Sequence, residues 1–178
     1  FVILTLTFIL FSAVHAVSMP DMYTDSLIYG NYLAKLIYDS EAIPLIAGGP
    51  SIGIELSANY PPGFQLLGVF ADIIAGEENQ IFLKLFSTAN LLFLIFLTYL
   101  WANKLFNRTF AILAVLLLVM SPVVILHSRV ASFYLYLVLH FSLAIYFLQK
   151  FTSTKSRIFL IAASIFSLFL IIPLSFSS

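Results

Sequence analysis

The sequence predicts an all-α, polytopic transmembrane protein with a long external loop. The chain has 178 residues, of which 62% are apolar and only 9% are Asp, Glu, Lys or Arg. Soluble domains have about 45–50% apolar and about 25% charged residues, so this chain has too few charges to cover a water-exposed surface. Its zero net charge argues against a nucleic-acid partner, and the absence of cysteine excludes disulfides and zinc–thiolate sites.

Five uncharged windows are long enough to cross a membrane, because a helix needs about 20 largely apolar residues to span the hydrocarbon core. We expect spans at residues 1–18, 81–102, 109–127, 131–149 and 158–175. The first window has an alternative, since the run ending Ala13-Val14-His15-Ala16 also fits a signal-peptide core with a cleavage site. We favour a retained helix because four further spans follow. We also expect a fragment of a longer membrane protein, since the chain begins at Phe1 inside one apolar run and ends inside another.

The charged residues predict which loops face the cytoplasm. Two short loops contain five of the eight basic residues and no acid: Lys104, Arg108, Lys150, Lys155 and Arg157. All eight acidic residues fall between positions 21 and 78. Because cytoplasmic loops are enriched in Lys and Arg, we expect the basic loops inside and the loop of residues 19–80 outside.

The external loop is expected to carry juxtamembrane helices. Residues 21–40 read as a helix, with an apolar stripe at Tyr29, Leu33, Leu36 and Ile37. Residues 41–60 are rich in glycine and proline and read as a loop. Residues 64–75 are apolar but too few for a span, so we expect an interfacial helix after Pro61-Pro62; a sixth span is the alternative.

Two aspartates in this loop are candidate catalytic residues. Asp21 and Asp25 are four residues apart and share one helix face. Asp21 stands where a capping residue belongs. Asp25 lies past the first turn and heads the apolar stripe, so a cap does not explain it, although a solvated carboxylate does.

Two basic residues near the outer ends of spans are candidate phosphate ligands. Lys84 lies at the outer end of the second span and is the first choice, and Arg129, in the turn between the third and fourth spans, is the second. Each is either a cation that pairs with a lipid phosphate or a snorkelling side chain at the interface. His127 beside Arg129 could bind metal, but three scattered histidines form no ligand cluster, and we predict neither a metal site nor a cofactor.

The order of these features resembles the N-terminal part of the GT-C membrane glycosyltransferases, especially relatives of protein O-mannosyltransferases and aminoarabinose transferases. The resemblance rests on Asp25 with Tyr29, on Tyr60-Pro61-Pro62, on Lys84 opening the second span, and on Ser121-Pro122 before His127-Ser128-Arg129. It departs from the family at Ser26, where Glu is usual, and at Tyr134, where an acid is frequent.

The resemblance implies inverting transfer of a sugar from a polyprenyl- or dolichyl-phosphate donor to an extracytoplasmic protein, lipid or glycan acceptor. It implies Asp25 as the general base with Asp21 as the alternative, and donor contacts from Lys84, Arg129, Tyr29 and Tyr60. Membrane lipids are then further partners. The expected location is an integral membrane position, in the plasma membrane of a prokaryote rather than the endoplasmic reticulum, with the site facing outside.

A multi-span transporter or a non-enzymatic membrane protein is the alternative. Transporters place polar residues or broken helices near the bilayer midplane. The five windows carry no charge near the middle of a span, and the polar residues gather at the outer side. This pattern favours an interfacial enzyme.

Overall fold

The computed structural model describes residues 2–20, 32–41, 63–77 and 79–171, and the regular elements in these ranges are all α-helices. They are α1 (Val2–Ser18), α2 (Leu33–Ser40), α3 (Gly63–Ala75), α4 (Gln80–Leu105), α5 (Arg108–Met120), α6 (Pro122–His127), α7 (Phe133–Thr154) and α8 (Arg157–Ile171). The predicted all-α class is thus confirmed for the described part of the chain.

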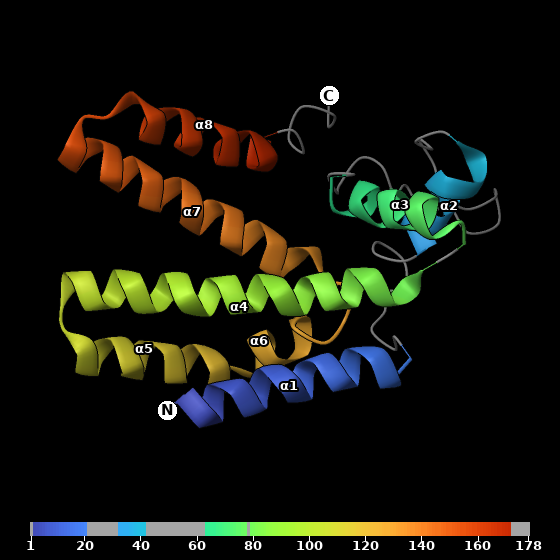
Figure 1. Cartoon of the computed structure of the whole chain (residues 1–178), viewed down its shortest axis with the longest axis horizontal. Coiled ribbons are helices and arrows are strands. Elements are labelled where there is room, and N and C mark those ends of the chain that lie inside the picture. The colour runs from blue at the N-terminus through green and yellow to red at the C-terminus, as the bar shows by residue number, and fades with distance from the viewer. Residues whose placement is uncertain (1, 21–31, 42–62, 78, 172–178) are drawn as a thin grey trace.

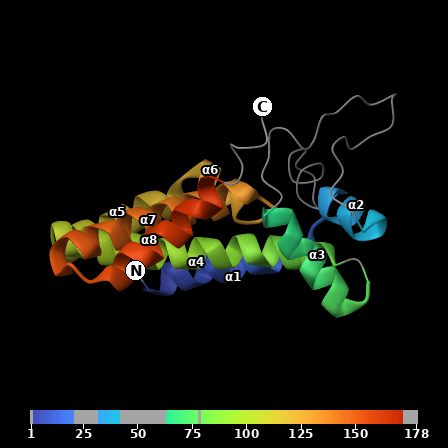
Figure 2. The same cartoon turned by 90° about the horizontal axis from the view of Figure 1, so that it is seen from above.

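The long helices form an up-and-down bundle (Figure 1). Helices α1, α5 and α8 run in one direction, and α4 and α7 run in the other. The α4–α5 and α7–α8 connections lie together at one end of the bundle, which we call the basic end. Helices α2 and α3 lie beyond the opposite end, which we call the acidic end (Figures 1 and 2).

The acidic side chains of the described ranges and five of the basic side chains lie at opposite ends, whereas Lys35, Lys84 and Arg129 lie toward the acidic end. The basic end carries Lys104, Arg108, Lys150, Lys155 and Arg157. The acidic end carries the acidic residues in the described ranges, which are Asp39, Glu41, Asp72 and Glu77. The separation seen along the sequence is therefore also a separation in space.

Polar side chains cap the N-termini of three of the bundle helices. The Asn79 side chain accepts a hydrogen bond from the backbone N–H of Phe82 at the start of α4. Asn107 accepts from Thr109 and Phe110 at the start of α5, and Ser132 accepts from Tyr134 at the start of α7. Such caps satisfy N–H groups that have no partner within the first helical turn.

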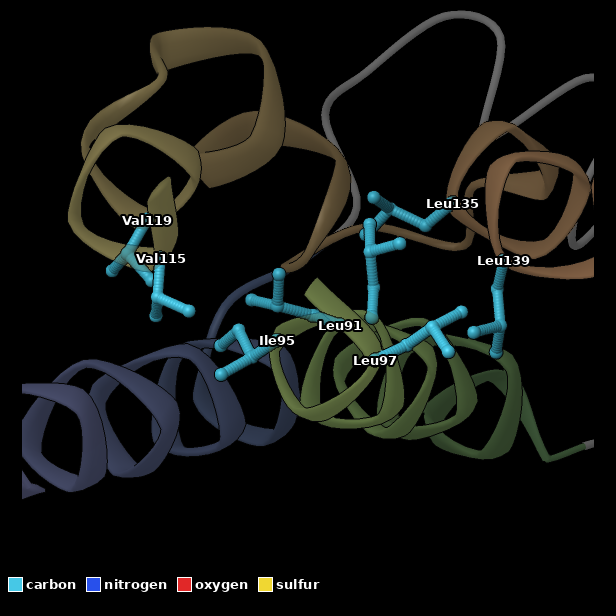
Figure 3. Close-up of a cluster of buried hydrophobic side chains, with 8 residues drawn as sticks. Leu91, Ile95, Leu97, Val115, Val119, Leu135 and Leu139 are labelled. Carbon is cyan, nitrogen blue, oxygen red and sulfur yellow. The ribbon is translucent and has the colours of Figure 1, made fainter. Parts of the chain in front are cut away.

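The core of the bundle lies around α4. Leucine, isoleucine and valine side chains of α4, α5 and α7 form its centre: Leu91, Leu94, Ile95, Leu97, Val115, Val119, Leu135 and Leu139. Figure 3 shows the α4 side chains between those of α5 and those of α7. Each helix contributes residues three or four positions apart, as expected for one buried stripe.

A second buried cluster joins the acidic end to the bundle. It contains Phe64 of α3, Leu83 of α4 and Tyr136 of α7 among its members. Helix α3 approaches α4 closely at Gly68, where a Cβ atom would lie 2.9 Å from Leu83 Cδ1 and 3.0 Å from the Cβ atom of Ala34 in α2. Glycine at this position therefore lets α2, α3 and α4 pack together.

Two described helices are long and apolar enough to cross a membrane, Ile81–Leu105 and Phe133–Thr154. They overlap the spans expected at 81–102 and 131–149 and support association with a membrane. Helix α1 covers most of the first expected span, and α8 follows the last one as far as the described residues extend. A helix is present where one was expected at residues 64–75, as α3.

The span expected at residues 109–127 is divided in the structure. Helix α5 ends at Met120, Ser121 is extended with φ −66° and ψ 122°, and α6 starts at Pro122. Proline has no N–H for the helical ladder, and it disfavours helical backbone in the residue before it. The two short helices together replace one continuous span.

Candidate functional site

Four of the predicted site residues, Asp21, Asp25, Tyr29 and Tyr60, lie outside the described residues. Lys84 and Arg129 are described, and each lies toward the acidic end of the bundle. The site can therefore be built from the two predicted cations and the side chains around them.

Lys84 is buried in the first turns of α4, with only 5% of its surface exposed. Its Nζ donates a hydrogen bond of 2.8 Å to the backbone carbonyl of Met19, directly after the end of α1. The last carbonyls of a helix lack partners within it, and the helix dipole makes that end negative. Lys84 thus ties the end of α1 to α4, a role that neither the snorkelling nor the phosphate-binding interpretation includes.

Arg129 lies in the turn between α6 and α7, with its guanidinium carbon 4.5 Å from the centre of the Phe11 ring of α1. Its Nε is buried and has no hydrogen-bond partner within the described part of the chain. Arginine stays protonated in proteins. The result is a fixed positive charge stacked on an aromatic ring, with an enclosed Nε that has no partner in the described structure.

The two cations contact α1 at different levels. Lys84 reaches Met19, whereas Arg129 lies over Phe11. Eight residues of helix separate these contacts, and at 1.5 Å per residue they lie roughly 12 Å apart along α1. Lys84 and Arg129 therefore do not converge on one small anion in this arrangement.

A layer of buried hydroxyl groups surrounds the turn that carries Arg129. Thr88 Oγ1 donates to the Ser128 carbonyl at 2.7 Å, and Ser87 Oγ donates to the Ser132 carbonyl at 3.3 Å. The backbone N–H of Ser132 donates to Ser87 Oγ at 3.1 Å. Ser12 of α1 adds a contact of 3.3 Å between its Oγ and that of Ser128.

The turn of residues 128–132, which we call the recessed turn, is set inward from the acidic end of the bundle. Its partner Thr88 stands eight residues after the start of α4 at Gln80. At 1.5 Å per residue, the recessed turn is roughly 12 Å deeper than the first residue of α4. The cation in this turn is thus set into the bundle rather than on its rim.

His127 belongs to the same layer. It is buried, and its Nδ1 lies 2.8 Å from Ser132 Oγ. The ring also packs on Tyr134 at 4.8 Å between centroids. Within the described ranges, no group of three His, Asp or Glu side chains is placed to hold a metal ion.

The sequence interpretation missed Ser87, Thr88 and Ser132. Single hydroxyl residues in an apolar window have no distinctive spacing, and serine or threonine can bond within its own helix. Ser87 and Thr88 do so as well, with the carbonyls of Leu83 and Lys84. The sequence signal that could have identified them is the adjacent pair Ser87-Thr88 within an apolar window, together with a short segment bounded by Ser128 and Ser132.

Comparisons with protein families, curated protein sequences and solved structures find no match to the chain.

Proposed function

We propose that the chain is the N-terminal membrane part of a GT-C-like glycosyltransferase that uses a polyprenyl- or dolichyl-phosphate sugar. Asp25 is the general base, which takes the proton of the acceptor hydroxyl as it attacks the sugar. A cation stabilises the phosphate that departs from the opposite face, so the anomeric centre inverts. The site faces the outside of a plasma membrane.

The environment of the Arg129 guanidinium is the observation on which this proposal rests. A guanidinium group held on an aromatic ring keeps its charge, and its donors match phosphate oxygens in pairs. Arg129 has a buried Nε without a described partner, whereas Lys84 already binds the Met19 carbonyl. Arg129 is therefore the first choice for the donor phosphate, with Lys84 second.

The outward faces of the helices support a polytopic membrane position. Large apolar side chains are exposed along α1, α4 and α5, including Ile3 (81%), Leu117 (73%) and Met120 (70%). Monomeric soluble proteins rarely expose large continuous apolar patches. A lipid environment accounts for these faces, and the positive-inside rule then directs the basic end to the cytoplasm.

The full-length protein provides the test, expressed in membranes and supplied with polyprenyl-phosphate sugars labelled in the sugar. We expect transfer of label to a membrane or envelope acceptor. Arg129→Met should reduce it at least tenfold, because a phosphate ligand is lost, whereas Arg129→Lys should keep part of the activity. Arg157→Met at the basic end is the matched control and should act like the parent. Absence of transfer by the parent with every donor would exclude the proposal.

A transporter is the second candidate, and two observations favour it. The α5–α6 segment is broken at Ser121-Pro122, and broken helices often line transport sites. Asn90 in α4 is 4% exposed, and its Nδ2 has no hydrogen-bond partner among the described residues. Uptake of a labelled solute that Asn90→Leu abolishes, with no sugar transfer by the parent, would support this candidate instead.

A further inference from the structure

Irregular backbone inside a membrane protein requires internal hydrogen-bond partners. Each unsatisfied N–H or carbonyl group in hydrocarbon costs several kcal/mol, so turns at that depth occur only where protein or water satisfies them. The recessed turn is such a segment, because it interrupts the helices roughly 12 Å below the first residue of α4. Its carbonyls and N–H groups must therefore be paired by neighbouring elements.

Two adjacent residues of α4 provide this pairing. Thr88 binds the first residue of the recessed turn through the Ser128 carbonyl. Ser87 binds the last residue through both the carbonyl and the N–H of Ser132. Both side chains are buried, Ser87 fully and Thr88 to within 5% exposure. The two hydroxyls thus attach both ends of the turn to one helix.

Arg129 follows directly after the residue that Thr88 holds. Two neighbouring residues of α1 contact this region. Ser12 lies against Ser128, and the ring of Phe11 lies under the guanidinium of Arg129. Ser128 is therefore held by its side chain to α1 and by its carbonyl to α4, while the next side chain extends over α1. A shift of the turn along α4 would carry Arg129 off the Phe11 ring.

We infer that Ser87 and Thr88 are positioning residues, which hold the recessed turn and its Arg129 at a fixed depth in the bundle. The benefit to donor binding rests on the proposed function. The attachment of the turn does not depend on it. Neither hydroxyl touches the donor; each acts through the backbone of the turn.

The attachment can be tested without any enzyme assay. Residues 1–178 contain no cysteine, so Val130→Cys introduces the one thiol of this part, at a position that is 7% exposed; any cysteine elsewhere in the full-length protein is first replaced by serine. We expect slow labelling by a membrane-impermeant maleimide in the full-length protein. Thr88→Val keeps the shape but removes the donor, and it should speed labelling on the order of tenfold, since a buried carbonyl loses its partner.

Two variants separate loss of the hydroxyl from general loosening. Thr88→Ser keeps the donor and should label as slowly as the parent. Thr152→Val is the matched control, because the Thr152 hydroxyl bonds only to a carbonyl of its own helix in the described structure, that of Gln149. If Thr88→Val does not accumulate in membranes, Ser87→Ala removes the other attachment and is compared in the same way. Unchanged labelling in Thr88→Val or its replacement would overturn the inference.

Donor kinetics decide whether the attachment serves the site. We expect Thr88→Val to raise the KM for the polyprenyl-phosphate sugar on the order of tenfold, with a smaller change in kcat, and Thr88→Ser to restore it. Faster labelling together with an unchanged KM would remove the positioning role. Faster labelling with no transfer by the parent would instead exclude the proposed function and leave the attachment of the turn in place.

Discussion

Lys84 has two separable roles in the structure and in the proposed reaction. Its ammonium group binds the carbonyl at the end of α1, and a hydrogen bond to a charged group contributes about 1.5–3 kcal/mol. Lys84→Met should therefore destabilise the protein by about 2 kcal/mol, which a lower thermal midpoint in detergent would detect.

The control for Lys84 is Lys84→Arg, which keeps a cation and should retain most of the stability. If Lys84→Met lowers the midpoint but leaves the KM for the donor unchanged, Lys84 only holds α1. If the KM for the donor rises in parallel, the hydrogen bond to the Met19 carbonyl is only one of the two roles of Lys84.

Asp25 and Asp21 are distinguished by parallel substitutions. Asp25→Asn keeps the shape of the side chain but cannot accept a proton, so turnover of the full-length enzyme should fall by roughly 10²–10⁴-fold. Asp21→Asn should be mild, because Asn caps helices about as well as Asp. Transfer from a lipid-linked donor at matched expression measures both variants. An inactive Asp21→Asn beside an active Asp25→Asn would reverse the assignment.

Single residues were predictable only where their charge was unusual. Lys84 and Arg129 stand out in an apolar sequence, and both proved to contact α1. Their particular partners were not predictable, because the Met19 carbonyl and the Phe11 ring reach them only after α1 packs beside α4 and the recessed turn. Ser87 and Thr88 were missed for the same reason.

At the scale of elements, Gly68 controls how α3 approaches α4. A Cβ atom at this position would lie 2.9 Å from Leu83 Cδ1 and 3.0 Å from Ala34 Cβ, which leaves no room for a side chain. Gly68→Leu should cost about 1–3 kcal/mol through overpacking and separate α3 from the bundle, which faster limited proteolysis near α3 would show. Phe70→Leu, at an exposed position of the same helix, should leave proteolysis unchanged. Equal proteolysis of both variants would contradict the close packing.

The outer face of α3 predicts contact with lipid. Leu66, Phe70, Ile73 and Ile74 are exposed and lie on one face. In a Trp101→Phe background, Phe70→Trp should give blue-shifted emission that lipids brominated in their acyl chains quench. Glu41→Trp, beyond the end of α2, serves as the water-exposed comparison. Equal emission from both positions would place α3 away from the bilayer.

Helix existence was easier to predict than helix continuity. The apolar windows predicted α3, α4, α5 and α7, because a helix that is buried or in contact with lipid needs mostly apolar residues. The break between α5 and α6 depends on Pro122 together with side chains that satisfy the following turn. Proline alone is tolerated in many membrane helices, so the sequence pattern did not decide between a kink and two helices.

At the scale of the whole molecule, charge segregation predicts orientation. Single cysteines at Ser153 near the basic end and at Glu77 near the acidic end occupy exposed positions. In intact cells an impermeant maleimide should label Glu77→Cys, while Ser153→Cys should react only after permeabilisation. Labelling of Ser153→Cys in intact cells would invert the proposed topology.

The unequal lengths of the helices have a consequence for the surrounding bilayer. Helix α4 rises roughly 39 Å over its 26 residues. The wall formed by α5 and α6 is shorter, because α6 leads into Ser128 at the level of Thr88. Along α4, Thr88 lies roughly 25 Å from the last residue, Leu105. In the proposed membrane position, this wall is shorter than a typical hydrocarbon thickness, and lipids beside it would compress or tilt at a cost of fractions of a kcal/mol per Å of hydrophobic mismatch. Thin, short-chain membranes would host this wall with the least deformation.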